Sequence, residues 1–478
     1  MLTPTIGIEV HVELKSKTKV FSDSINNFKD DINTNVNVID LGFPGTLPKL
    51  NKEVINEALK AALALNCKIN KEMHFERKNY FYPDLPKGYQ ITQKDTPIGV
   101  SGYLEIIDDG VIKKIGIERI HIEEDTCKSI HKNNMTLLNA NRAGVPLIEI
   151  VSKPVIKSAK EAMLYLEKLR ETLLYLGVSD VKIEEGSLRC DANVSLSNND
   201  ELGTKTEIKN IGSISNVGIA INYEIERQKK ILESNNKVIE ETRRFDDKTN
   251  TTILMRVKET GNDYRYMPEP DIPYVILSDL EIESIRKTIP KLPDEIRLEY
   301  KNLGINNNAI NTLINNKELN DYLSSIIEKA NPVLLANMLT GDILGYLNKN
   351  FIKLENIKLT KEEFINLVNK IDKNEINKNQ SKDILNYILE NGGTVDDTLK
   401  KLDIKQMNNE NELIDIVNNV LKNNTESIND YKNGKERAIK YLMGQIMKEA
   451  KGNANPVKVN EILIRELSNY WYIYTYIV

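Results

Sequence analysis

The first strand-like segment of the chain alternates core residues with residues of types that bind metal ions. In the stretch IGIEVHVEL, from Ile6 to Leu14, apolar side chains alternate with Glu9, His11 and Glu13. Successive side chains of a strand point to opposite sides, so the apolar set would form one face and the polar set the other. The polar face is either a set of metal ligands or a solvated surface, and the segment alone does not decide between them.

Three other strand-like segments carry charged side chains in a similar way. They are IERIHIEED, SLRCDANVSL and TKTEIKN, which begin at residues 117, 187 and 204. Their polar residues are His121, Glu123, Glu124 and Asp125, then Arg189, Asp191, Asn193 and Ser195, then Lys205, Glu207 and Lys209. If four such strands formed the floor of one cleft, the repulsion between its carboxylates would require a counter-ion. The alternative is a set of scattered surface salt bridges, which contribute little to stability.

The residue types also indicate which metal such a cleft would hold. Carboxylates with one imidazole suit Mg²⁺ or Mn²⁺, whereas Zn²⁺ more often recruits thiolates or several histidines. The three cysteines, Cys67, Cys127 and Cys190, form no C-x-x-C pair, which argues against a zinc site and against a disulfide framework. No apolar run approaches the ~20 residues of a membrane span, and the first strand leaves no room for a signal peptide. We therefore expect a cytoplasmic protein.

Two segments rich in tyrosine combine aromatic, basic and proline residues. They are RKNYFYPDLPKGYQI, from Arg77 to Ile91, and NDYRYMPEPDIP, from Asn262 to Pro273. Such rigid loops present flat faces and hydrogen-bond donors to a nucleotide or to an RNA end. The alternative is a proline-stiffened loop in which the tyrosines only pack. The phosphate-binding motif G-x-x-x-x-G-K-[ST] is absent, and no G-x-G-x-x-G motif follows an expected strand. Any bound ATP would therefore need a different kind of phosphate site.

The order of the expected elements predicts an α+β fold followed by helices. The chain has 478 residues and a net charge of −5, which suits two to three domains. Helical patterns at residues 51–65 and 158–176 lie among many short strands that do not alternate regularly with helices, as in an antiparallel α+β domain. Five prolines between residues 268 and 293 mark the end of this first domain, and beyond them the pattern is helical.

The last part of the chain has a local excess of positive charge. Between residues 432 and 458 there are seven basic residues and only two acidic ones, Glu436 and Glu449. The basic residues are Lys432, Lys435, Arg437, Lys440, Lys448, Lys451 and Lys458. Such an excess attracts a phosphate backbone, but solvated helix faces show it too. The final NYWYIYTYIV is either a partner contact or a plain terminus.

Eight sequence strings along the chain are recognisable together: IGIEVHVEL, NVIDLGFPGTLPKLN, RKNYFYPDLPKGYQI, NRAGVPLIEIVSKP, EEGSLRCDANVSL, ETRRFDD, DYRYMPEPDIP and LMGQIMKEAKGNANPVKVNEIL. Over nearly the whole chain they resemble one family, the B subunits of the bacterial aspartyl/glutamyl-tRNA amidotransferases. The likeness is weakest between about residues 300 and 420. Some family members carry a cysteine zinc motif that is absent here, so we expect no structural zinc.

The resemblance implies a ligase of protein biosynthesis that works as a heterotrimer. One partner, an amidase, releases ammonia from glutamine, and a small third subunit holds the amidase to the B subunit. That chain uses ATP and Mg²⁺, or Mn²⁺, to phosphorylate the side-chain carboxylate of Glu-tRNA(Gln) or Asp-tRNA(Asn), and ammonia then displaces the phosphate. The implied architecture is a cradle-shaped α+β catalytic domain over residues 1–291, a helical domain over 292–403 and a helical tail that grips tRNA over 404–478.

The resemblance also implies roles for particular residues. It assigns the catalytic divalent ion to Glu9, His11, Glu124, Asp191 and Glu207. From their positions we expect Lys78, Arg189, Lys205 and Arg256 to neutralise the phosphoryl group. Tyr80 and Tyr82 are expected to hold the aminoacylated CCA end or adenine.

Two other functions stay open at this point. The chain is either the activating subunit or a non-catalytic scaffold that only holds tRNA and its partner. A self-contained metal phosphatase or nuclease would explain the carboxylate cluster without any partner protein. The sequence does not decide between Glu-tRNA(Gln) and Asp-tRNA(Asn) as the substrate.

Overall fold

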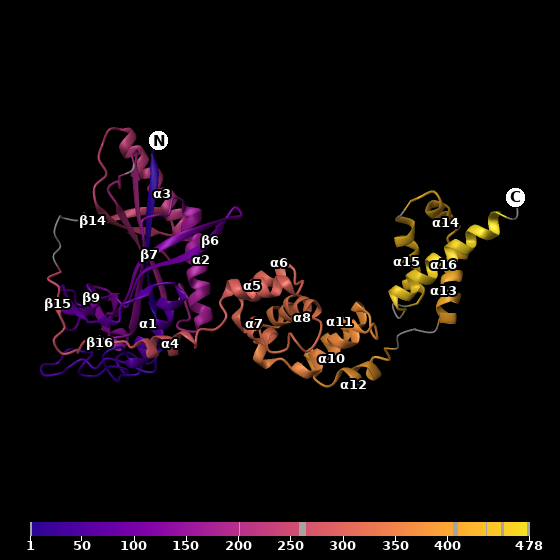
Figure 1. Cartoon of the computed structure of the whole chain (residues 1–478), viewed down its shortest axis with the longest axis horizontal. Coiled ribbons are helices and arrows are strands. Elements are labelled where there is room, and N and C mark those ends of the chain that lie inside the picture. Colours follow the sequence, from indigo (N-terminus) through magenta and orange to yellow (C-terminus); the bar gives the residue numbers. More distant parts are fainter. Residues whose placement is uncertain are drawn as a thin grey trace. The chain divides into compact units, whose positions relative to one another are not determined.

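The computed structural model describes residues 2–199, 201–257, 264–404, 410–435, 437–450 and 454–475. The chain divides into two compact units, Met1–Glu295 and Ile296–Val478. The first unit combines a large sheet with helices, and the described part of the second is helical (Figure 1). The predicted α+β class with a helical C-terminal part is therefore confirmed, while the division into three domains stays a prediction.

A nine-stranded sheet forms the centre of the first unit, in the order β14-β13-β12-β11-β1-β10-β7-β6-β2. All neighbouring strands are antiparallel except β12 and β13. The strands are β1 (Thr3–Glu13), β2 (Lys68–Ile69), β6 (Gly99–Asp108), β7 (Val111–Glu124), β10 (Pro146–Ser152), β11 (Leu188–Ser197), β12 (Thr206–Lys209), β13 (Glu241–Asp246) and β14 (Thr251–Val257). Strand β1 thus lies between two strands that follow it by more than a hundred residues.

Three helices pack against the apolar side of this sheet. They are α1 (Lys52–Ala64), α2 (Ala159–Leu176) and α3 (Ile214–Glu233), and their buried residues share one core with Ile8 and Val10 of β1. Helix α2 begins where the Ser158 hydroxyl accepts the Glu161 backbone N–H, and ends at Gly177, whose φ of 75° is left-handed. The predicted alternation of β1 is confirmed, because its apolar residues are buried in this core while Glu9 and His11 are on the opposite side.

Short strands and a hairpin complete the first unit. Strands β4 (Glu76–Asn79), β5 (Tyr89–Thr92) and β15 (Met267–Pro268) form a three-stranded sheet, and β3 (Glu72–Met73) pairs with β16 (Val275–Ile276). Strands β8 (Lys128–Lys132) and β9 (Met135–Asn139) form a hairpin that leads into the short helix η1 (Ala140–Arg142). Helix α4 (Asp279–Arg286) begins with a capping box between Ser278 and Glu281.

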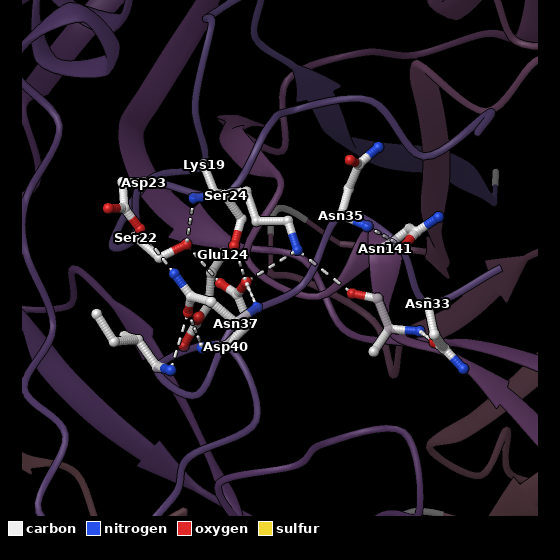
Figure 2. Close-up of polar contacts among 12 residues, drawn as sticks. Lys19, Ser22, Asp23, Ser24, Asn33, Asn35, Asn37, Asp40, Glu124 and Asn141 are labelled. Carbon is white, nitrogen blue, oxygen red and sulfur yellow. Dashed lines mark hydrogen bonds and ion pairs between the residues drawn. The ribbon is translucent and has the colours of Figure 1, made fainter. Parts of the chain in front are cut away.

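A buried ion pair fastens the loop between β1 and α1 (Figure 2). Lys19 is completely buried, and its ammonium group lies 3.2 Å from Asp40 Oδ2 and 3.3 Å from the carbonyl oxygen of Ala140. The hydroxyl groups of Ser22 and Ser24 each donate to Asp40 at 2.6 Å. Burying two charges is tolerated only when they are paired and hydrogen-bonded, so this network fixes the loop.

The second unit, together with helix α5, which begins just before the boundary, contains two groups of helices. From residue 293 to 404 they are α5 (Pro293–Asn302), α6 (Asn307–Asn315), α7 (Lys317–Ser324), α8 (Pro332–Met338), the π-helical η2 (Leu339–Ile343), α9 (Leu344–Asn350), η3 (Leu354–Asn356), α10 (Lys361–Asp372), α11 (Lys378–Asn391) and α12 (Val395–Lys401). From residue 410 they are α13 (Glu410–Asn423), α14 (Thr425–Lys432), α15 (Arg437–Glu449) and α16 (Pro456–Thr475).

Helices α13 to α16 share a core of their own, which includes Leu413, Leu442 and Leu463. Helix α16 begins where the Asn455 side chain accepts the backbone N–H of Val457 at 2.9 Å. None of the helices in the described ranges has the length and apolar composition that crossing a membrane requires.

Candidate active site

The register of the large sheet brings two histidines and a glutamate into one row. His11 in β1 is opposite Glu149 in β10, and Glu149 is opposite His121 in β7. Residues that are directly opposite in a sheet point to the same face. The row therefore lies on the side of the sheet that carries Glu9, away from the core helices.

A second row begins on the other edge of β1. Glu9 is opposite Asp191 in β11. Lys209 of β12 places its ammonium group 2.5 Å from Asp191 and 3.1 Å from Glu207. Burial disfavours the charged form of Lys209, but the two carboxylates outweigh this effect and raise its pKa. One ammonium group therefore joins Asp191 to Glu207.

A cavity of about 890 Å³ opens over these two rows. Eight of the eleven residues with a role at the catalytic site predicted from the sequence or the resemblance line it: Glu9, His11, Lys78, Tyr80, Arg189, Asp191, Glu207 and Arg256. The lining also includes Gln90, Glu123, Asp125, Glu149, Lys209 and Tyr264. The structure thus joins residues from all four charged segments and from both tyrosine-rich segments in one place.

The row of histidines and glutamates forms a closed polar network. Glu149 Oε2 lies 3.4 Å from Nε2 of His11 and 3.4 Å from Nε2 of His121. Glu123 spans the same two rings, with Oε1 at 3.5 Å from His11 and Oε2 at 3.8 Å from His121. Within the described residues the Nδ1 atom of His121 is buried without a hydrogen-bond partner. Each carboxylate of the pair therefore faces two imidazoles.

The carboxylates control the charge of both rings. Burial opposes protonation of His121, but Glu149 and Glu123 outweigh it and raise its pKa to about 9. The pKa of His11 is also raised, because its hydrogen bond to Glu149 and the charges of Glu123 and Glu9 exceed the effect of burial. Glu9 behaves in the opposite way: burial, and then repulsion by Glu149, raise the pKa of its carboxyl group. Repulsion from neighbouring carboxylates thus adds to burial in disfavouring the charged form of Glu9.

The donor set suits a hard divalent cation. In the cavity, two groups of three described residues have ligand atoms within 4.8 Å of one another: Glu9, His11 and Asp191, and then His11, Glu123 and Glu149. Both groups share His11 and offer mainly carboxylate oxygens, which Mg²⁺ and Mn²⁺ prefer. Burial and then repulsion by Glu149 raise the pKa of Glu9, and a bound cation would relieve that repulsion. The residues present therefore fit such an ion.

Glu124 is not in either group, although the resemblance implies it. Neighbouring residues of a strand point to opposite faces, and Glu123 shares its face with His121. The carboxylate of Glu124 accepts hydrogen bonds from the Lys87 ammonium group at 2.5 and 2.6 Å and from the backbone N–H of Ile91 at 2.9 Å. Glu207 is also outside both groups, since Lys209 and the Thr242 hydroxyl hold its carboxylate.

Two further candidates, Lys205 and Tyr82, do not line the cavity. Lys205 is exposed and its ammonium group lies 3.9 Å from Glu240. Lys209, at the end of β12, is the lysine that reaches the carboxylates. Tyr82 is 56% exposed and its ring packs edge-on against Tyr80, with the centroids 6.0 Å apart.

The positive side chains of the cavity differ in how they are held. Arg189 donates to Asp125 at 2.8 Å, and Arg142 donates to the same oxygen at 2.7 Å. Within the described residues, Lys78 and Arg256 make no ion pair. An anionic ligand can therefore bind these two cations without first breaking an internal salt bridge.

The predicted RNA-binding residues lie on or beside the helices of the C-terminal group. Exposed side chains are those of Lys435, Arg437, Lys440, Lys448 and Lys458, while Lys432 is half-buried and Lys451 lies outside the described residues. On α15 the exposed Tyr441 and Gly444 follow the same helix face as Arg437 and Lys448. Lys435 is paired with Asp430 at 2.8 Å. The side chains of the aromatic C-terminus from Tyr470 onward are outside the described set.

Two family models match the chain in the order of its domains. Residues 4–283 match the GatB/GatE catalytic domain. Residues 321–467 match the GatB domain that accompanies it. The first match contains the whole cavity described above, so the fold and the site define a catalytic subunit of the GatB/GatE class.

Curated relatives match over nearly their whole length. The aspartyl/glutamyl-tRNA(Asn/Gln) amidotransferase B subunit from Staphylococcus haemolyticus (strain JCSC1435) is 48% identical over 466 residues, which is 97% of this chain and 98% of the relative. The B subunits from Oceanobacillus iheyensis and Bacillus cereus (strain AH187) are each 47% identical, over 469 and 471 residues, 97% and 98% of this chain and 98% and 99% of the relatives. The chain belongs to the family of aspartyl/glutamyl-tRNA amidotransferase B subunits.

Proposed function

We propose that this chain activates the side-chain carboxylate of Glu-tRNA(Gln) or Asp-tRNA(Asn) with ATP and converts it to the amide. The observation that carries the proposal is the acidic cavity, which gathers Glu9, His11, Asp191 and Glu149 from neighbouring strands inside a domain that matches a catalytic family model. A protein that served only as a scaffold would have no need to bring mutually repelling carboxylates together. Carboxylates are poor acyl donors, so amide formation requires their activation.

The chain's own residues have separable tasks in this proposal. Glu9, His11 and Asp191 would hold a divalent ion, Mg²⁺ or Mn²⁺, with Glu123 and Glu149 on the other side of His11. Such an ion, when bound, neutralises phosphate oxygens. Glu207 would act through its ion pair with Lys209. Glu124, which the family resemblance implies as a ligand, would act from beside the cavity, where Lys87 holds its carboxylate.

The cations of the cavity would bind the transferring phosphoryl group. Lys78 and Arg256 are suited to this task because they make no ion pair with described residues, and Arg189 is anchored to Asp125. Phosphoryl transfer depends mainly on positioning and on neutralising charge. Tyr80 and Tyr82 would hold the CCA end or adenine, and Lys205, which is exposed, would act only at the rim.

The partners follow from the chemistry of the same reaction. Within the cavity, no described group is placed as a source of ammonia, so we infer a heterotrimer with a partner amidase and a small third subunit, working in the cytoplasm. No structural zinc is part of the proposal. The helical tail, with its basic residues, would grip the tRNA, whose aminoacyl carboxylate enters the cavity.

Reconstitution tests the function directly. The chain is assembled with the amidase and the small third subunit and supplied with ATP, glutamine and either mischarged tRNA, and the amidated aminoacyl-tRNA is measured. We expect amide from at least one of the two substrates, and labelled phosphate from ATP in step with it. Absence of product from both substrates contradicts the proposal, and equal phosphate release by the isolated chain on simple esters would instead favour a phosphatase.

The tail gives a prediction of its own. We expect the double variant Lys440→Gln, Lys448→Gln to weaken binding of both tRNAs alike and to lower the slope of log affinity against log salt by about 2, because each phosphate contact contributes about one unit. Both residues are exposed on α15. Filter binding between low and moderate salt measures the slope. Lys422→Gln, exposed on α13, is the matched control, and an unchanged slope in the double variant refutes this placement of the RNA.

A further inference from the structure

Four tyrosine rings from two distant segments form a continuous line, here called the tyrosine track: Tyr82, Tyr80, Tyr264 and Tyr266. The centroids of successive rings are 6.0, 6.1 and 6.1 Å apart, and the ring planes meet at 64°, 75° and 75°. Edge-to-face pairs of this kind are favourable. The loops of two separate segments thus produce one aromatic surface.

Specific contacts hold the two segments of the track together. The backbone N–H of Asn79 donates to the carbonyl oxygen of Tyr264 at 2.9 Å, and its side-chain amide donates to that of Arg265 at 2.6 Å. Arg77 grips Glu269 with two hydrogen bonds of 2.7 and 2.8 Å. Arg265 has a φ of 44°, a left-handed conformation that is unfavourable for arginine and persists only where its surroundings enforce it.

The track leads from solvent to the cavity. At its outer end Tyr82 is 56% exposed and the neighbouring Phe81 is 80% exposed. Further along, Tyr80 and Tyr264 line the cavity. Positive groups accompany the rings, with the Lys78 ammonium group 4.9 Å from the Tyr264 centroid and the Arg265 guanidinium 5.9 Å from that of Phe81. The surface therefore offers flat faces and cations in succession.

We propose that the tyrosine track binds the single-stranded 3′ end of the tRNA by stacking its last two bases in a fixed order. The terminal base lies against Tyr80 and Tyr264, and the base before it lies against Tyr82 and Phe81, so the aminoacylated ribose reaches the mouth of the cavity. The inference rests on the proposed function. It adds Tyr264 to the residues that bind the RNA, and it identifies the ligand of the tyrosine rings as the RNA end rather than the adenine of ATP.

The arrangement of the rings supports this choice. Proteins bind single strands with aromatic rings that take successive bases and with cations that follow the backbone. The adenine of ATP needs only one such position, and it brings its phosphates with it. A line of rings that starts in solvent and ends at an acidic cavity instead suits a chain that continues outward. The strained Arg265 and the Asn79 contacts keep this line in place before the RNA arrives.

Two fluorescent tRNAs test the order of the bases on the assembled complex. One carries 2-aminopurine in place of the terminal adenine, and the other carries pyrrolocytosine in place of the penultimate cytosine. Both probes are quenched when they stack, and both tRNAs are left uncharged so that no reaction intervenes. We expect Tyr264→Ala to relieve the quenching of the terminal probe and Tyr82→Ala to relieve that of the penultimate probe. Each loss corresponds to about a tenfold weaker interaction of that base.

Matched variants separate stacking from damage to the fold. Tyr80→Phe keeps the ring and should keep the quenching, whereas Tyr80→Ala should relieve that of the terminal probe. Tyr274→Ala removes an exposed ring that packs on His74, outside the track, and should change neither probe. Quenching that survives in Tyr264→Ala and in Tyr82→Ala overturns the proposal. So does a loss of ATP binding in Tyr80→Ala with both probes unchanged, because adenine would then occupy the ring.

The same measurements distinguish this inference from the proposed function. If the complex quenches both probes in the expected order but forms no amide, the track stands and the proposed function fails. If the complex forms amide while neither probe responds to the variants, the proposed function stands and the track is wrong.

Discussion

An Asp191→Asn protein is expected to assemble and to bind tRNA normally while amidation falls by about three orders of magnitude. Asparagine keeps the shape of the side chain but removes its negative charge. Asp191 forms one candidate metal-ligand group with Glu9 and His11, so this group loses a carboxylate. The substitution also takes a carboxylate from Lys209, whose ammonium group lies 2.5 Å away. Loss of several kcal/mol of charge stabilisation at the transferring phosphoryl group corresponds to a factor of about 10³ in rate.

Two measurements separate this effect from general damage. The amount of labelled phosphate formed from ATP should fall together with the amide, whereas the tRNA dissociation constant should not change. Asp109→Asn removes a carboxylate that is 87% exposed at the turn between β6 and β7 and paired with Lys160, and it should leave amidation intact. A variant at Asp191 that retains full turnover would show that the acidic cavity is a scaffold.

Local alternation in the sequence was enough to predict parts of both the fold and the site. The polar face of β1 was predicted because side chains alternate strictly in a strand, and Glu9 and His11 indeed lie on the face opposite the core. The helix starts at Asn51 and Ser158 were predictable from their caps, which act over three residues. Such features depend only on near neighbours along the chain.

The family resemblance and the geometry of strand β7 point to different neighbours, Glu124 and Glu123, as the metal ligand. His121 and Glu123 are two residues apart and so share a face, which the alternation already contains. Glu124 points the other way and pairs with Lys87. Glu149 was missed for a different reason: it is the single acidic residue of the apolar stretch PLIEIVS, and a buried strand gave no reason to expect a ligand there.

The remaining features depend on contacts between distant segments. The row of His11, Glu149 and His121 exists only because β10 pairs with both β1 and β7. No local pattern specifies which strands become neighbours, since that choice depends on how the whole core packs. The same applies to Tyr264, which joins Tyr80 through the pairing of β15 with β4. Segments rich in tyrosine were recognisable, but their meeting was not.

Removing one partner of the buried pair between Lys19 and Asp40 is expected to destabilise the first unit strongly. In Asp40→Asn the Lys19 ammonium group would remain completely buried with only neutral acceptors, such as the Ala140 carbonyl and the new amide oxygen. Breaking a buried ion pair in this way costs about 3 to 5 kcal/mol, because one charge is left uncompensated. Glu185→Gln, which breaks exposed pairs with Lys29 and Lys182, is the control and should have little effect.

The pH dependence of the stability lost in Asp40→Asn identifies the cause of that loss. Burial lowers the pKa of Lys19, and Asp40 opposes that effect, so the pKa in Asp40→Asn should be lower still. Below the folded pKa the lysine must be buried charged, and the full penalty applies. Above it the folded state releases the proton while the unfolded chain keeps it up to about pH 10.5, so the deficit should shrink as the pH rises from the folded pKa of Lys19 in the variant to its less strongly lowered pKa in the parent protein. Urea unfolding followed by the near-ultraviolet circular dichroism of the tyrosines measures this difference. A deficit that stays constant over this range would mean that lost packing, rather than an unpaired charge, destabilises the variant.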